Sequence, residues 1–92
     1  MPSKFCRPTI STAAYVRVDS TIRGRCRIVV NNPAGIACRW VGQTPTQPAL
    51  GEATYLRMAS NSNAVWEFFC DPYETWILAE SGGGNLELQI DY

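Results

Sequence analysis

Apolar and polar residues alternate along most of this chain, and short turn-forming sequences interrupt the alternation at regular intervals. In residues 85–91, for example, Leu86, Leu88 and Ile90 fall on one phase, with acidic or amide side chains on the other. Successive side chains of a strand point to opposite faces, so a two-residue period predicts a strand with one buried face. No segment keeps a helical period. The sequence therefore predicts an all-β protein with antiparallel strands.

About seven or eight short strands are expected. The segments with clear alternation are residues 14–19, 25–30, 36–41, 53–58, 64–70, 74–79 and 85–91. Short strands separated by regularly spaced turns favour two packed sheets, as an antiparallel β-sandwich or jelly roll. Residues 1–12 are expected to form an extended N-terminal arm, because prolines stand near both of its ends, and residues 13–92 a single domain.

Turn chemistry predicts how the strands connect. Residues 32–35 place proline second and glycine fourth, as a type I turn prefers, so segments 25–30 and 36–41 are expected to pair as a hairpin. The proline-rich segment 42–51 is expected to be an extended crossover between two sheets. Further turns are predicted at residues 61–63, 71–72 and 82–84, the last using glycine at positive φ.

Several strands are apolar on both faces, which a thin sandwich has little room to bury. Core-facing positions are assigned to Ala14, Val16, Val18, Cys26, Ile28, Val30, Ile36, Cys38, Trp40, Trp66, Phe68, Leu86, Leu88 and Ile90. The apolar residues of the opposite phase include Tyr15, Val29, Val41, Tyr55, Val65, Phe69, and either Ile77 or its neighbours Trp76 and Leu78. Another subunit is the favoured cover for the surplus face. The alternative is a cover made by the crossover loop or the N-terminal arm.

Composition argues against an enzyme and against a metal site. At 92 residues the chain forms one domain, and it contains no histidine, the commonest proton carrier and metal ligand. The four cysteines, Cys6, Cys26, Cys38 and Cys70, form no close pair in sequence and are expected to be reduced, mostly buried thiols. A Cys26–Cys38 bridge is conceivable across the predicted hairpin. We expect no catalytic residue, no cofactor and no metal.

The first residues lack the apolar segment of a signal peptide, and no apolar run is long enough to cross a bilayer. We therefore expect a protein made in a cytosol, with no membrane partner.

Charge is divided unevenly along the chain although it sums to zero. Residues 1–40 contain seven bases against one acid, and residues 41–92 contain seven acids against one base. Two arrangements remain open. The halves form a basic and an acidic region that dock on unlike surfaces, or the strands interleave and neutralise one another.

Arg23, Arg25 and Arg27 form a basic cluster that also suits nucleic acid. The zero net charge and the absence of an aromatic RNA-binding motif make nucleic acid an unlikely partner, and a subunit-facing edge is the favoured interpretation.

Three stretches carry a family resemblance: residues 40–46 (Trp-Val-Gly-Gln-Thr-Pro-Thr), 48–56 (Pro-Ala-Leu-Gly-Glu-Ala-Thr-Tyr-Leu) and 75–88, which contains the glycine triplet. Together with the turn at Pro33–Gly35, they resemble the small accessory head proteins of tailed bacteriophages. The resemblance implies a virion decoration or cement protein, assembled in the host cytoplasm, that binds the major capsid protein and clamps neighbouring capsomers. It also implies a homodimer or homotrimer at a symmetry axis. The family has no signature residues, so it supplies no site.

The leading hypothesis is therefore a non-enzymatic structural protein of a phage capsid. Its interface is predicted at Arg7, Arg23, Arg25, Arg27, Tyr55, Phe69 and Trp76. The alternative is a tail- or fibre-associated module that binds a carbohydrate or another host ligand, with an exposed Trp76 or Tyr55 stacking on a sugar ring. A third possibility is a nucleic-acid-binding β-barrel that uses the arginine cluster.

Overall fold

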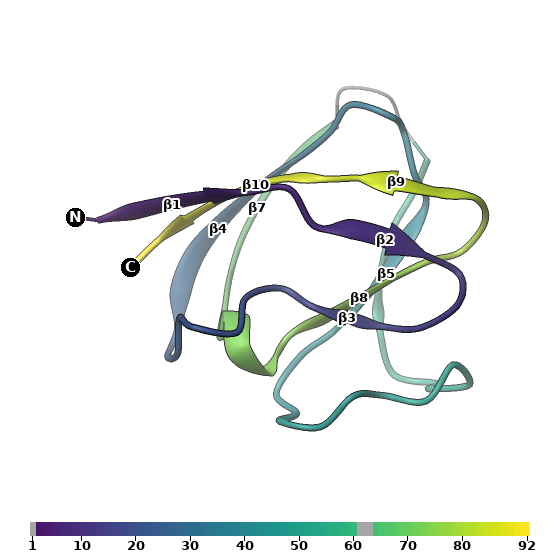
Figure 1. Cartoon of the computed structure of the whole chain (residues 1–92), viewed down its shortest axis with the longest axis horizontal. Helices are drawn as coiled ribbons and strands as arrows, with labels where there is room; N and C mark the ends of the chain where they lie inside the picture. Colours follow the sequence, from purple (N-terminus) through teal and green to yellow (C-terminus); the bar gives the residue numbers. More distant parts are fainter. Residues whose placement is uncertain (1, 61–63) are drawn as a thin grey trace.

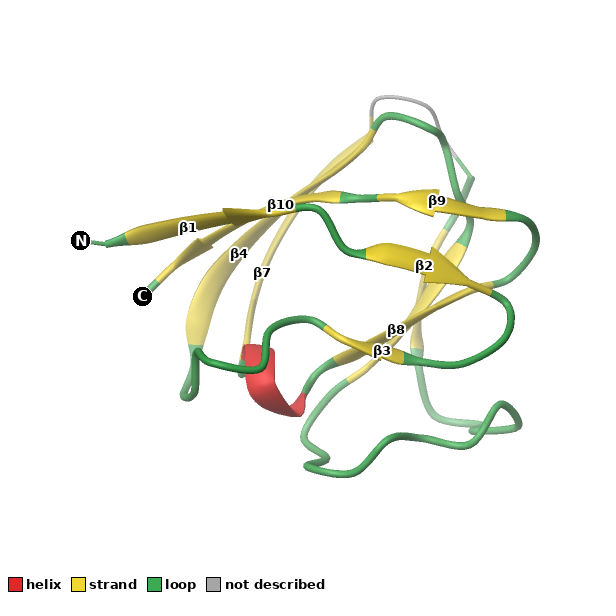
Figure 2. Ribbon diagram, in the orientation of Figure 1, coloured by secondary structure: helices red, strands yellow, loops and turns green. Residues whose placement is uncertain are grey.

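The computed structural model describes residues 2–60 and 64–92, which form an all-β fold with antiparallel sheets, compatible with a β-sandwich (Figures 1 and 2). The strands are β1 (Ser3–Cys6), β2 (Thr9–Ser11), β3 (Val16–Arg17), β4 (Cys26–Asn32), β5 (Cys38–Val41), β6 (Leu56–Met58), β7 (Ala64–Cys70), β8 (Trp76–Ala79), β9 (Gly83–Asn85) and β10 (Glu87–Asp91). One short 3-10 segment, η1 (Pro72–Glu74), is capped by the Asp71 side chain. The all-β prediction is confirmed.

Two four-stranded sheets enclose the core. Sheet I has the order β1-β10-β4-β7, and sheet II has the order β3-β8-β5-β6. Their facing sides share one apolar cluster, in which the rings of Trp40 and Phe68 meet edge to face at 5.0 Å. The fully or nearly buried members include Ile10, Ile28, Val30, Cys38, Met58, Ile77, Leu86, Leu88 and Ile90. The inward phases predicted for strands 25–30, 36–41 and 85–91 are confirmed.

The two ends of the chain form one antiparallel ribbon. Ser3 pairs with Asp91 and Cys6 with Leu88, and the same register continues in the β2-β9 pair, from Thr9–Asn85 to Ser11–Gly83. The N- and C-termini therefore lie side by side in Figure 1. The segment 1–12 was predicted as an extended arm, but in the structure its strands pair with the chain's own C-terminal strands. The inner side of β10 packs in the core, so the backbone N–H and C=O groups along both of its edges need partners, and β1 supplies them on the side away from β4.

The ribbon requires glycine where β2 and β9 meet. A Cβ atom on Gly83 would lie 2.7 Å from the Ile10 carbonyl oxygen, and one on Gly84 would lie 2.9 Å from the Ile36 side chain. Gly82 and Gly84 have φ of 68° and 152°, which confirms the predicted use of positive φ in this turn.

The hairpin predicted between segments 25–30 and 36–41 is wrong. The turn itself forms, with the Gly35 amide donating to the Asn32 carbonyl at 3.1 Å, but β4 pairs with β10 and β7 whereas β5 pairs with β6 and β8. The buried Asn32 side chain explains the difference. Its amide donates to the Ile36 carbonyl at 2.8 Å and its oxygen accepts from the Ile36 N–H at 2.9 Å, so the chain is turned into the other sheet.

The proline-rich segment does not cross between sheets as predicted, because it connects the neighbouring strands β5 and β6 of sheet II. It instead folds over the outer face of that sheet. Trp76 Nε1 donates to the Thr44 carbonyl at 2.9 Å, and Gln47 Nε2 donates to the Tyr15 carbonyl at 2.8 Å. An outer apolar cluster of Tyr15, Val41, Trp76 and Leu78 is buried there. The turn predicted at residues 61–63 lies outside the described residues.

Asn32→Ala is expected to destabilise the fold by about 2–4 kcal/mol, because the buried Ile36 N–H and carbonyl both lose a partner. Chemical denaturation measures the loss. Asn31→Ala is the matched control, since its amide makes one hydrogen bond to Glu87 on the half-buried outer side, and it should cost about 1 kcal/mol or less. Equal losses would contradict the role given to Asn32.

Stability is expected to fall at acid pH partly through Asp19. Burial alone would raise its pKa, but hydrogen bonds from Lys4, Thr21 and the Ile22 amide outweigh burial and lower the pKa from 3.8 to about 2. This stabilisation is present above pH 3.8 and is lost as the pH falls through 2. Asp19→Asn should lower the unfolding free energy by about 1–2 kcal/mol at neutral pH, and the difference from wild type should shrink toward pH 2. A difference independent of pH would contradict this explanation.

Candidate interaction surface

The outer face of sheet I is formed by alternate residues of its four strands. Phe5 of β1, Gln89 of β10, Val29 of β4 and Glu67 of β7 are register neighbours in one row across the sheet. The partners of the next row, Ser3, Asp91, Arg27 and Phe69, share the same face. Residues far apart in sequence therefore meet on one face of the sheet.

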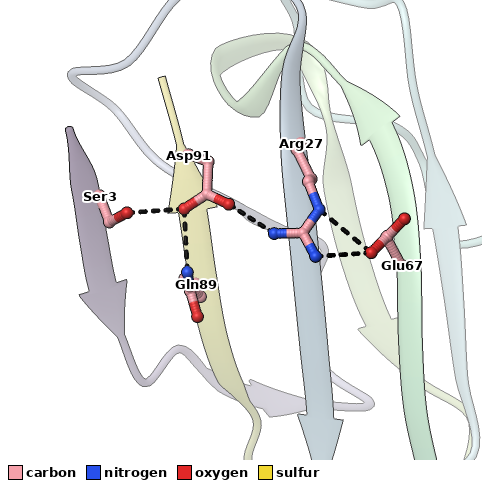
Figure 3. Close-up of polar contacts among 5 residues, drawn as sticks. All are labelled: Ser3, Arg27, Glu67, Gln89 and Asp91. Carbon is pink, nitrogen blue, oxygen red and sulfur yellow. Dashed lines mark hydrogen bonds and ion pairs between the residues drawn. The ribbon is translucent and has the colours of Figure 1, made fainter. Parts of the chain in front are cut away.

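A chain of polar contacts, here called the polar strip, runs across this face (Figure 3). Ser3 Oγ donates to Asp91 Oδ1 at 2.7 Å, and Gln89 Nε2 donates to the same oxygen at 3.0 Å. Arg27 bridges the strands on either side: Nη1 donates to Asp91 Oδ2 at 2.6 Å, and Nη2 donates to Glu67 Oε2 at 2.6 Å. Hydrogen bonds from Ser3, Gln89 and Arg27 lower the pKa of Asp91 to about 2. Each charge of the strip is therefore paired, but two carboxylates share one guanidinium, so the strip carries a net charge of −1.

A second set of contacts on the same face links β4 to the terminal ribbon. Arg7 Nη2 lies 2.9 Å from Glu87 Oε2, and the Asn31 amide donates to Glu87 Oε1 at 2.9 Å. The Arg7–Glu87 pair is well exposed, so it adds little to stability. Because Glu87 is paired with Arg7, its carboxylate adds no unpaired charge to this face.

Exposed apolar side chains border the polar strip. Phe5 on the edge strand β1 is 74% exposed, and Val65 and Phe69 on the edge strand β7 are 67% and 52% exposed. Phe5 lies at one edge of the sheet, and Val65 and Phe69 lie at the other, with the polar strip between them. These three residues are here called the outer patch. The two sheets thus differ, because the outer cluster of sheet II is buried under the chain's own loop whereas the outer patch of sheet I stays in solvent.

A pocket of about 730 Å³ opens where the sheet II edge strand β6 approaches the end of the sheet I edge strand β7. It is here called the seam pocket, and its walls include Arg25, Tyr55, Leu56, Phe69, Cys70 and Asp71. The Arg39 guanidinium stacks on the Tyr55 ring at 4.5 Å and is itself held by Glu80 at 2.9 Å. The position of Tyr55 at the pocket is thereby supported by a charged neighbour.

The structure separates the predicted interface residues into groups. Arg7, Arg27 and Phe69 lie on the same outer face of sheet I, with Arg7 at the opposite edge from Phe69, and Arg25 and Tyr55 line the seam pocket with Phe69. Arg23 and Trp76 belong to neither group.

Trp76 is not the exposed ring predicted for sugar stacking. It is 8% exposed, lies under the proline-rich loop, and is covered by the Arg17 guanidinium at 4.5 Å. Arg17 also stacks on Tyr73 at 4.0 Å, and Arg23 stacks on the same ring at 3.7 Å. These aromatic rings stabilise two arginines that have no ion pair among the described residues.

Of the two charge arrangements left open, the structure adopts interleaving. Bases of the first half meet acids of the second in Arg7–Glu87, Arg27–Glu67, Arg27–Asp91 and Arg39–Glu80. The basic cluster is split by this pairing, since Arg27 is neutralised and Arg25 instead lies 5.8 Å from the Phe69 ring.

Sequence reasoning missed Phe5, because the segment Ser3 to Cys6 (Ser-Lys-Phe-Cys) does not alternate between polar and apolar residues and so gives no strand signal. The partners of the polar strip were also missed, because they depend on which strands are neighbours and no local pattern gives that information.

Among residues 2–60 and 64–92, no group of three or more histidine, cysteine, aspartate or glutamate side chains is placed to hold a metal ion. The same part of the chain contains no helix long and apolar enough to cross a membrane.

Comparison with protein-family models, with curated proteins and with solved structures found no match to this chain.

Proposed function

We propose that this protein is a non-enzymatic decoration or cement protein that binds the outside of a phage capsid through the outer face of sheet I. The observation that carries the proposal is the bare outer patch of Phe5, Val65 and Phe69, on a fold whose other sheet buries its outer apolar cluster under its own loop. An aromatic and aliphatic patch left in solvent on a small domain marks a protein-binding surface.

The physical balance at this face favours a protein partner. Burying a phenylalanine or valine side chain fully contributes about 1.5–3 kcal/mol, so the outer patch supplies a substantial gain. Charged groups oppose burial when they are left unpaired. Here Arg27 is already paired with Glu67 and Asp91, and the one excess negative charge of the polar strip favours a partner that supplies a base.

The choice of the capsid as partner rests on the resemblance of residues 40–46, 48–56 and 75–88 to phage accessory head proteins. In this proposal the domain has a jelly-roll-like arrangement, is assembled in the host cytoplasm and remains in the virion. Self-association as a dimer or trimer uses the outer edges of β1 and β7, each of which has a strand neighbour on one side only in the described structure. The partner it binds is the major capsid protein.

The double substitution Val65→Ser with Phe69→Ser is expected to weaken binding to assembled shells at least tenfold, because it removes two members of the outer patch. Co-sedimentation with shells of the major capsid protein encoded in the same genome measures the effect. Leu50→Ser is the matched control, since Leu50 is 51% exposed in the loop that covers sheet II and should bind as wild type. Shell binding by the double variant at wild-type strength would contradict the proposal.

The seam pocket favours a second candidate function, carbohydrate binding. It combines partly exposed Tyr55 and Phe69 rings with the polar side chains of Arg25 and Asp71, which is the mixture that stacks on and hydrogen-bonds a sugar. The buried Trp40 also lines it, so occupancy has a fluorescence signal.

Titration with bacterial cell-wall oligosaccharides tests this second function. Saturable quenching of tryptophan fluorescence is expected if it is correct, and Tyr55→Ala should weaken it at least tenfold. Tyr92→Ala, which changes an exposed tyrosine at the C-terminus, is the control. An unchanged spectrum across the oligosaccharides would leave the capsid proposal alone.

A further inference from the structure

Two of the four cysteines face each other across neighbouring strands. Cys26 at the start of β4 is the register partner of Cys70 at the end of β7, on the inner side of sheet I. Directly opposite residues of an antiparallel pair have Cα atoms about 4.5–5.5 Å apart. That separation falls within the range of about 4.4–6.8 Å that a disulfide spans.

The other two cysteines have no such partner. Cys6 of β1 is opposite Leu88, and Cys38 of β5 lies between Met58 and Ala79. Cys38 is fully buried, and burial raises its pKa to about 11, so it is shielded from reagents. They provide internal controls for the pair.

Cys70 is also accessible. It is half-buried and forms part of the wall of the seam pocket, whose volume of about 730 Å³ admits a small peptide. Arg25, which has no ion pair among the described residues, lines the same pocket and offers a guanidinium to a carboxylate. Oxidised glutathione, a small disulfide that carries both carboxylates and ammonium groups, therefore has a route to Cys70 and can pair with Arg25 and with the pocket carboxylates Asp71 and Glu74.

We propose that Cys26 and Cys70 are a redox-active dithiol site, which a low-molecular-weight disulfide converts into a cross-strand disulfide. The Cys70 thiolate attacks one sulfur of oxidised glutathione, which forms a mixed disulfide and releases one glutathione thiolate. The Cys26 thiolate then attacks the Cys70 sulfur and releases the second glutathione. Two protein thiols are oxidised, and one glutathione disulfide is reduced to two glutathione molecules.

The position of the pair decides what the bond does. β7 is an edge strand, and its only strand neighbour in the described structure is β4, so the disulfide fastens the end of β7 to the centre of sheet I. Because Cys70 forms part of the wall of the seam pocket, a thiol can also reach the bond, and exposed disulfides are the more readily reduced ones.

Burial raises the pKa of both Cys26 and Cys70, so both are mainly protonated at neutral pH. Because the thiolate is the reacting form, thiol–disulfide exchange at this pair is slow at neutral pH and faster at alkaline pH. The dithiol site does not depend on binding of the outer face of sheet I to a capsid.

The full chain, incubated with excess oxidised glutathione at pH 8, then unfolded in denaturant and alkylated, tests the proposal by mass spectrometry. The expected product has lost two hydrogen atoms, carries two alkyl groups on Cys6 and Cys38, and yields a cross-linked Cys26–Cys70 peptide. Adding glutathione should restore four alkylated cysteines. Alkylation of Cys26 and Cys70 after oxidation, or a bond between any other pair, would overturn the proposal.

Cys26→Ser should trap glutathione on Cys70 as a mixed disulfide, whereas Cys70→Ser should form no intramolecular bond. Cys6→Ser is the matched control and should still form the cross-link. If a serine variant fails to fold, the peptide map of the wild-type protein decides the question alone.

Discussion

The pairing of the two ends of the chain is the constraint on which the rest of the fold depends. One register runs from Ser3–Asp91 to Ser11–Gly83, so the N- and C-terminal segments form a continuous ribbon that contributes Ile10 and Ile90 to the core. β10 in turn pairs with β4, and β4 pairs with the edge strand β7. The edge that bears Phe69 is thus built outward from the ribbon, although the two are distant in sequence.

The outer faces of the two sheets are covered differently. A small domain cannot bury both sides of every strand from a single core, so each sheet needs a cover or leaves a face in water. The proline-rich loop covers sheet II. Its Thr44 carbonyl accepts a hydrogen bond from the Trp76 indole N–H, and its Gln47 side chain donates to the Tyr15 carbonyl. Sheet I has the polar strip, in which Arg27 pairs with two carboxylates, bordered by the outer patch. This difference is what directs the functional proposal to one side of the molecule.

Much of the strand pattern was readable from the sequence, whereas the partners were not. The phases of residues 25–30 and 85–91 were predicted because alternation is local. The hairpin was wrong because the type I turn at residues 32–35 fixes only a reversal of direction, and the buried Asn32 side chain sends the chain to the other sheet. Trp76 was expected outside because its phase opposes Ile77, but phase does not reveal a covering loop.

The sequence by itself determined the class of fold, the inward phases of residues 25–30, 36–41 and 85–91 and the lack of histidine, because these depend on composition and on neighbours along the chain. Only the tertiary structure decided that Arg27 joins Asp91 to Glu67, that Cys26 faces Cys70, and that Phe5 and Phe69 border one surface. These facts depend on strand order and register, which long-range hydrogen bonding and packing set. Many strand orders satisfy the same local alternation, so no local pattern selects among them.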